Sequence, residues 1–103
     1  MEPNLKVNLN RDETCDFFSF HGNIDAQAET SLKEIPGQVR TSTVKFDFSK
    51  TGRINSMGIA FLLRCLKSIR DEKKAEVYLS GLSPMNTMLF KMTGIFLLAS
   101  PSK

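Results

Sequence analysis

The sequence predicts an α/β domain in which a mixed, mostly parallel sheet of four or five strands carries about three helices, mainly on one face. Apolar strand patterns alternate with amphipathic helical patterns along most of the chain, an order typical of parallel strands joined by crossover helices. The first two strand patterns instead follow each other directly, which gives the sheet an antiparallel start. With 103 residues, of which 41% are hydrophobic, the chain is expected to form a single domain, residues 1–103, around one core.

Two strands open the chain. Apolar and polar residues alternate over residues 5–9, which indicates a half-buried strand. Residues 15–20 form a second strand after a polar turn at residues 10–13, and Gly22 breaks it.

A short helix and a third strand follow. Asp25 is a good N-cap for the helix, and the Pro36-Gly37 pair is expected to close it. The third strand covers residues 43–48 and is bounded by the polar residues 49–52.

The clearest element is an amphipathic helix predicted from near Ser56 to near Lys73. A strand at residues 77–79 comes next. The apolar stripe of the helix consists of Ile59, Leu62, Leu63, Leu66 and Ile69.

A third helix is predicted to begin at Ser83-Pro84, a hydroxyl cap followed by proline in the first turn, and to end at Gly94. Residues 95–98 are expected to add a last short strand, and the tail, residues 100–103, to fray. The residues predicted to face the core from this helix are Met85, Met88, Leu89 and Met92.

The charge balance does not predict a nucleic-acid partner. The net charge of +3 comes from 14 basic against 11 acidic residues, and Asp71 and Glu72 interrupt the densest basic stretch. No aromatic residues lie between these cations to form a stacking platform, so a solvated helix end is the better interpretation. The stretch consists of Arg64, Lys67, Arg70, Lys73 and Lys74.

The cysteines and the apolar runs predict a cytoplasmic protein. Cys15 and Cys65 lie far apart and form no CxxC motif, which favours free thiols in a reducing compartment. The first six residues contain no apolar signal segment, and the longest nearly apolar run, Met57–Leu63, is too short to cross a bilayer. We therefore expect no membrane partner.

Catalytic chemistry has no positive support in the sequence. The one histidine, His21, stands next to a turn glycine, and no nucleophile elbow, P-loop or zinc-protease motif occurs. Asp25 and Asp47 could meet at one sheet edge, which is weak support for a metal site. We expect no catalytic residue, no metal and no cofactor. An enzyme remains an alternative only if Asp25, Asp47 and Ser56 form a site there.

Ser56 is the residue most open to a functional interpretation. It stands after a strand and a loop, just before the amphipathic helix, where free backbone N–H groups and the helix dipole favour an anion. A phosphate there would be tolerated and would change what docks on that surface. The local sequence alone favours a simple N-cap, because such caps are common, and the two roles are compatible. Gly58 lowers helix propensity, and one reason for it is that a side chain would block approach to the serine.

Met57, Phe61 and Arg64 are predicted on the outer face of this helix. The thioether of Met57 and the ring of Phe61 would form a small apolar patch beside Ser56 that suits a partner protein. The alternative is that Phe61 packs beneath a neighbouring helix or loop.

Four segments, in order and at matching spacing, resemble the STAS domain, the family of bacterial anti-sigma factor antagonists and their relatives. The resemblance covers roughly residues 17–98 and implies the fold described above. The segments are His21-Gly22-Asn23-Ile24-Asp25-Ala26, Phe46-Asp47-Phe48-Ser49, Ile54-Asn55-Ser56-Met57-Gly58-Ile59, and Gly81-Leu82-Ser83-Pro84 with Met92-Thr93-Gly94-Ile95.

The resemblance implies partner switching through Ser56. In members that switch, a serine kinase with a histidine-kinase-like ATPase fold phosphorylates the serine in this position, and a PP2C-type phosphatase removes the phosphate. The unmodified form captures a downstream protein target, and the domain itself performs no chemistry. We expect a monomer. The expected partner-binding residues are Asn55, Met57, Gly58, Phe61, Arg64 and Asp25.

The sequence departs from the family pattern at Asn55, where the usual residue is Asp, and at Met57, which fills a second Ser/Thr position. Ser56 is therefore the only hydroxyl left in this pair. A switch would control a sigma factor, or a stress-response or biofilm programme. The alternative function is an unswitched STAS subunit docked on a transporter ATPase.

Overall fold

The structure, a computed structural model, describes residues 5–102 as a five-stranded sheet with helices packed against it. The strand order is β1-β2-β3-β4-β5; β1 pairs antiparallel with β2, and the remaining pairs are parallel. The predicted mixed, mostly parallel sheet is confirmed. The strands are β1 (Lys6–Arg11), β2 (Asp16–Ile24), β3 (Thr43–Ile54), β4 (Glu76–Ser80) and β5 (Ser100–Pro101).

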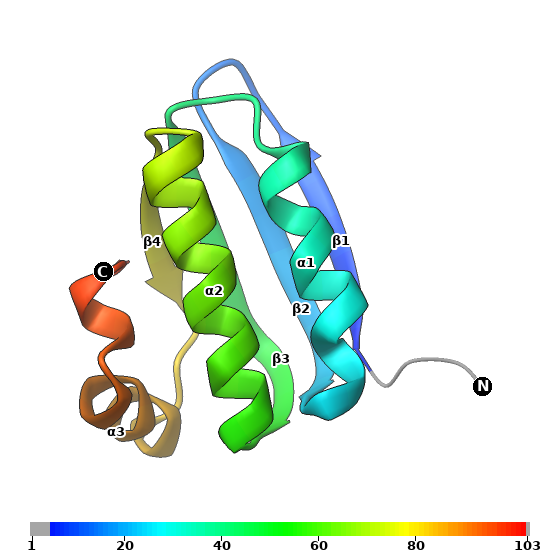
Figure 1. Cartoon of the computed structure of the whole chain (residues 1–103), viewed down its shortest axis with the longest axis vertical. Coiled ribbons are helices and arrows are strands. Elements are labelled where there is room, and N and C mark those ends of the chain that lie inside the picture. The colour runs from blue at the N-terminus through cyan, green and yellow to red at the C-terminus, as the bar shows by residue number, and fades with distance from the viewer. Residues whose placement is uncertain (1–4, 103) are drawn as a thin grey trace.

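Two helices, α1 (Glu29–Gln38) and α2 (Ser56–Glu72), lie side by side across one face of the sheet (Figure 1). The third, α3 (Pro84–Thr93), lies at the end of the molecule where α2 begins. The core forms between the two long helices and the strand residues that face them. No helix within residues 5–102 is long and apolar enough to cross a membrane.

Phenylalanine rings from the two central strands fill the middle of the core. Phe20 of β2 stacks on Phe48 of β3 with ring centroids 5.0 Å apart, and Phe46 meets Phe20 edge to face at the same distance. Successive residues of a strand point to opposite faces, so the residues between these phenylalanines lie on the open face of the sheet. Lys45 and Asp47 accordingly remain exposed or half-exposed.

Strand β3 is longer than predicted, because β2 does not end at Gly22. The pairing continues through Gly22 opposite Thr51 to Ile24 opposite Ile54, with register shifts that absorb the irregular backbone at Gly22, where φ is +108°. The expected boundary at residues 49–52 is therefore wrong. The extension carries β3 directly to the first turn of α2.

The first helical segment begins as predicted but does not end at Pro36. The Asp25 side chain accepts a hydrogen bond of 2.9 Å from the Gln27 backbone N–H and caps a 3-10 turn, Ala26–Ala28, that leads into α1. The helix then continues through Pro36 to Gln38. Pro36 has no N–H to donate to the preceding turn, so the helix loses one hydrogen bond there, and it ends two residues later.

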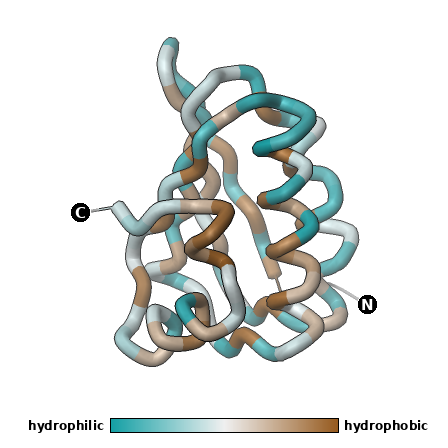
Figure 2. Tube along the Cα trace, turned by 60° about the vertical axis from the view of Figure 1, so that its left-hand side comes forward, coloured by the Kyte–Doolittle hydropathy of each residue, from teal (hydrophilic) through white to brown (hydrophobic). Residues whose placement is uncertain are grey.

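The C-terminal segment also differs from the prediction. Ile95–Leu97 forms a 3-10 turn rather than a strand, and the residues expected to fray form β5, where Ser100 lies opposite Tyr78. The Ser102 N–H also donates to the Leu79 carbonyl, at 2.6 Å. Figure 2 shows the hydrophobic residues after α3 as a brown stretch just before this end of the chain.

The methionines of α3 do not face the core, which contradicts the prediction. Met85, Met88 and Met92 are 79%, 63% and 79% exposed. The helix is anchored from its other side by Phe90, which is fully buried and packs edge to face on Phe48 at 5.3 Å. Since α3 lies at the end of the sheet, only one of its sides has a neighbour in the part of the chain that the structure describes.

Candidate functional site

The start of α2 is held against the end of β2 by Asn55. Its backbone N–H donates to the Ile24 carbonyl at 3.2 Å, and its side-chain Oδ1 accepts from the Gly58 N–H at 2.9 Å. Asn55 is thus the N-cap of α2, and the expectation that Ser56 caps this helix is wrong. Asparagine and aspartate both cap well, so the substitution of Asn for the usual Asp preserves the cap and removes a charge.

Ser56 is the first residue of α2, and its side chain is exposed. The capping hydrogen bond comes from Asn55, so the Ser56 hydroxyl is not needed to hold the helix in place. The backbone N–H groups of a first helical turn and the helix dipole favour a negative charge at this point. The first turn of α2 contains no acidic residue that would repel one.

Gly58 is required by packing and not by access to Ser56. A Cβ at this position would lie 2.0 Å from the Ile24 carbonyl oxygen and 2.6 Å from its carbon. The backbone of α2 therefore lies directly on the end of β2. Asp25 follows Ile24 in the chain, so this close approach brings Asp25 to the same end of the sheet as Asn55.

The predicted patch on α2 is only partly present. Met57 is 49% exposed, whereas Phe61 is 7% exposed and belongs to the core, so the prediction that it lies on the outer face is wrong. Phe61 packs beneath α1, the alternative that the sequence left open. Arg64 is exposed and places its guanidinium carbon 6.0 Å from the centre of the Phe61 ring. Arg64 lies eight residues after Ser56, about 12 Å along the helix.

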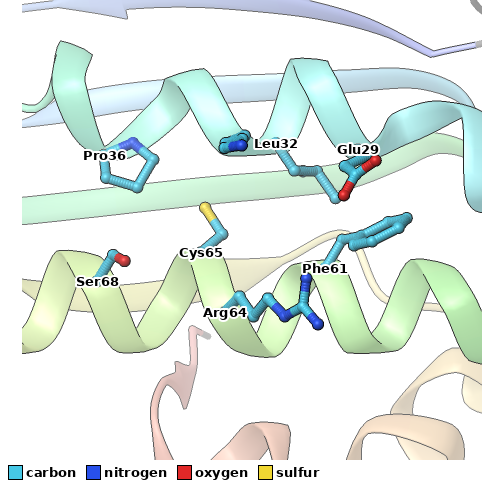
Figure 3. A pocket seen from close by; sticks show the side chains of 8 residues that line it. Glu29, Leu32, Pro36, Phe61, Arg64, Cys65 and Ser68 are labelled. Atoms are coloured by element: carbon cyan, nitrogen blue, oxygen red, sulfur yellow. The ribbon is translucent and has the colours of Figure 1, made fainter.

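A small groove of about 230 Å³ separates α1 from α2 (Figure 3). Glu29, Leu32 and Pro36 border it from α1, while Arg64, Cys65 and Ser68 border it from α2. Burial raises the pKa of the Cys65 thiol to about 12, so Cys65 stays protonated and is a poor nucleophile. Both cysteines are free thiols, as predicted.

The carboxylates considered for catalysis or metal binding are each engaged in their own turn. Asp25 accepts from Gln27, and Asp47 accepts from the Ser49 N–H at 3.0 Å and hydroxyl at 3.1 Å. Within residues 5–102, no group of three or more His, Cys, Asp or Glu side chains could hold a metal ion. The hydrogen bonds of Asp25 and Asp47 go to neighbouring residues of their own segments and not to Ser56.

A larger groove, of about 600 Å³, connects the start of α2 with α3. Thr51, Arg53 and Asn55 line one side, and Ser83 and Met85 line the other. Sequence patterns could not reveal this groove, because it depends on how α3 is placed against the extended end of β3. The chain from residue 48 to residue 70, which forms one side of the groove and most of α2, contains lysines and arginines but no aspartate or glutamate.

The model of the STAS domain family matches residues 6–100, and the chain therefore belongs to the STAS family. The fold agrees with this assignment, since solved STAS domains and anti-sigma factor antagonists superpose on most of the chain. Comparison with curated protein sequences yields no match.

Three solved structures illustrate the likeness in fold. An anti-sigma factor antagonist from Mycobacterium paratuberculosis has a TM-score of 0.78 at 15% identity, over 98% of this chain and 87% of that chain. Unphosphorylated SpoIIAA, from Bacillus, has a TM-score of 0.73 at 16% identity, over 95% and 89%. The STAS domain of a SulP transporter from Vibrio cholerae has a TM-score of 0.66 at 13% identity, over 88% and 71%.

Proposed function

We propose that this STAS domain is a signalling protein of the anti-sigma factor antagonist type that changes partners according to the phosphorylation state of Ser56. The observation that carries the proposal is the division of labour at the start of α2. Asn55 caps the helix, while the exposed Ser56 hydroxyl next to it is free of that task. A kinase can therefore modify Ser56 without removing a contact that the fold needs.

Electrostatics supports a phosphate at this position. Phosphorylation adds nearly two negative charges, and the first turn of α2 accommodates them through its N–H groups and dipole. The cations at residues 50 and 53 precede the site in β3, and no acidic residue occurs between residues 48 and 70. The modified domain keeps its fold, and the added charge changes which protein surface can dock there.

The proposed partners are a serine kinase with a histidine-kinase-like ATPase fold, a PP2C-type phosphatase and a downstream protein target. The domain itself catalyses no reaction and acts in the cytoplasm as a monomer. Asn55, Met57 and Gly58 surround Ser56 and are the proposed first contacts, with Asp25 beside them and Arg64 further along α2. Phe61, being buried, supports this surface from below.

The second candidate function is that of an unswitched STAS subunit docked on a transporter ATPase. The likeness to the STAS domain of a SulP transporter supports it, because the same fold occurs in that transporter. In this case Ser56 would be a contact residue and would never be phosphorylated.

The test compares variants of the full chain in a pull-down from cells that produce it. Ser56→Asp should lose the partner that the original protein captures, and Ser56→Ala should keep it and resist phosphorylation, as detected by mass spectrometry. Ser42→Asp is the matched control, because Ser42 is exposed and precedes β3, at the opposite end of the sheet. Unmodified Ser56 in cells, together with full capture by Ser56→Asp, would refute the switch and favour the transporter subunit.

A further inference from the structure

The exposed side of α3 is an apolar surface without a neighbour among residues 5–102. Met85, Met88 and Met92 are spaced by three and four residues, which places them on one side of the helix. All three are strongly exposed, and we call this surface the methionine face. The opposite side of α3 is anchored by Phe90, so the methionines contribute little to holding the helix in place.

Methionine is suited to a surface that receives another protein. Its unbranched thioether chain adapts to the shape of an apolar partner, and surfaces rich in methionine recognise helices in several known cases. Large apolar side chains gathered in this way mark an interaction site more often than an ordinary surface. Exposed Leu97 lies in the 3-10 turn after α3, but its carbonyl accepts a hydrogen bond from Arg70 near the end of α2, so it is not part of the methionine face.

The charges around the methionine face are positive. Lys91 lies between Met88 and Met92 in the chain and on the same side of α3, and no Asp or Glu follows Glu76 in the sequence. Arg53 lines the groove that Met85 also lines, and Lys50 is exposed on the neighbouring part of β3. Asp47 is an acidic residue close to Gly81, since its Oδ1 would lie against a Cβ at that position. Its carboxylate already accepts hydrogen bonds from Ser49.

We propose that the methionine face docks an amphipathic helix of a partner protein whose polar side is acidic. The apolar side of that helix would cover the methionines, and its carboxylates would face Lys91 and Arg53. A second copy of this chain is a poorer occupant, because it would bring a further set of cations to the same place.

The groove between Asn55 and Met85 joins the methionine face to the start of α2, next to Ser56. The inference rests on the proposed function in one respect, which is that the acidic helix belongs to the partner captured while Ser56 is unmodified. A phosphate on Ser56 would repel carboxylates docked at this end of the molecule. Charge repulsion then provides the physical basis for release.

The test uses the full chain labelled with 13C in its methionine methyl groups and two synthetic amphipathic helical peptides. The peptides share one leucine face, and their polar face is glutamate in one and lysine in the other. The glutamate peptide should shift the methyl signals of Met85, Met88 and Met92 in a saturable way. The lysine peptide should bind about tenfold more weakly, as expected when several exposed charge contacts change sign.

Two variants locate the contact. Met88→Gln with Met92→Gln should abolish the shift of the Met85 methyl signal that remains, while leaving the thermal midpoint unchanged. Lys91→Glu should reduce the preference for the glutamate peptide. The proposal would be overturned if both peptides bound equally, or if the glutamate peptide bound without shifting the methyl signals of α3. It would also be overturned if these methyl signals were lost when vesicles of anionic lipid are added, because the face would then bind a membrane. A dimer seen by sedimentation and dissociated by the double variant Met88→Gln with Met92→Gln would overturn it too, because the face would then bind a second copy of the chain.

The same titration separates this inference from the switch. If the glutamate peptide binds the methionine face of Ser56→Asp as tightly as that of the original protein, the docking surface stands and the switch through Ser56 fails. If Ser56→Asp loses its cellular partner while the double methionine variant keeps it, the switch stands and the docking surface is refuted.

Discussion

At the scale of single residues, adjacent positions at the start of α2 have separate tasks. Asn55 ties the helix to β2 through its backbone and to Gly58 through its side chain. Gly58 lets the two elements touch, since any side chain there would overlap the Ile24 carbonyl. Ser56 lies between them with its hydroxyl outside this packing. The site therefore combines a rigid base with one exposed, modifiable group.

This division predicts different costs for two alanine substitutions. Asn55→Ala should lower the free energy of unfolding by about 1 kcal/mol, because the Gly58 N–H loses its acceptor. Ser56→Ala should change it by less than about 0.5 kcal/mol, as is usual for an exposed side chain. Urea denaturation of both variants measures the difference.

Asn55→Asp is the conservative control, and it should unfold close to the original protein because aspartate also caps. A larger loss for Ser56→Ala than for Asn55→Ala would show that Ser56 holds the helix in solution, and would count against a freely modifiable hydroxyl.

At the scale of elements, the sequence predicted the buried face of a helix where the spacing of its apolar residues decides it. It failed where the buried face depends on elements distant in the sequence. The apolar stripe of α2 is buried as predicted at Ile59, Leu62 and Ile69, because helical spacing on an amphipathic helix identifies its core face. The same reasoning failed for α3, where the methionines have helical spacing but no element covers them. Position in the fold, rather than spacing, decides which side of α3 is buried.

The two sides of α3 should therefore respond oppositely to truncation. Phe90→Ala should lower the free energy of unfolding by about 3–5 kcal/mol, because it empties a fully buried site against Phe48. Met92→Ala should change it by less than about 0.5 kcal/mol. Thermal or urea unfolding of the purified variants provides the comparison, and a Met92→Ala loss of the same size as that of Phe90→Ala would place Met92 in the core after all.

The candidate site was predictable to a similar degree. Ser56 was found from its place before an amphipathic helix and from the family pattern, both of which are local in the sequence. The reason for Gly58 was not, because the group that excludes a side chain is the carbonyl of Ile24 on another strand. The burial of Phe61 likewise depends on α1, which no pattern within α2 can report.

At the scale of the whole molecule, a buried carboxylate connects two segments at the end of the sheet opposite the Ser56 site. Asp16, at the start of β2, is fully buried and forms an ion pair with Arg11 of β1. It also accepts from the backbone N–H groups of Arg40 at 2.7 Å and Thr41 at 2.9 Å, and from the Thr41 hydroxyl at 3.0 Å. One side chain thus joins the β1–β2 hairpin to the loop between α1 and β3.

This arrangement predicts that stability depends on pH through Asp16. Burial by itself raises the pKa of this carboxyl, but the hydrogen bonds from Arg11, Arg40 and Thr41 outweigh it and hold the pKa below the ordinary value of 3.8. A carboxyl with a lowered pKa in the folded state adds stability above its unfolded pKa, and this contribution is lost as the pH falls through the folded pKa. The stabilisation is therefore complete at neutral pH and declines from about pH 4 downward.

Asp16→Asn isolates this contribution. At pH 7 the variant should be less stable by about 1–3 kcal/mol, because the Arg11 pair is lost and buried N–H groups lose part of their acceptor. The difference from the original protein should shrink below about pH 4, since the original carboxyl then becomes protonated. Hydrogen bonds also lower the pKa of Asp12, which leaves acid sensitivity in both proteins, so the difference between their urea unfolding curves is the quantity to follow. A difference that stays constant from pH 7 to pH 2 would mean that the charge of Asp16 does not stabilise the fold.

Because Asp16 and the Ser56 site lie at opposite ends of β2, Asp16→Asn should leave phosphorylation of Ser56 at pH 7 unchanged as long as the chain is folded.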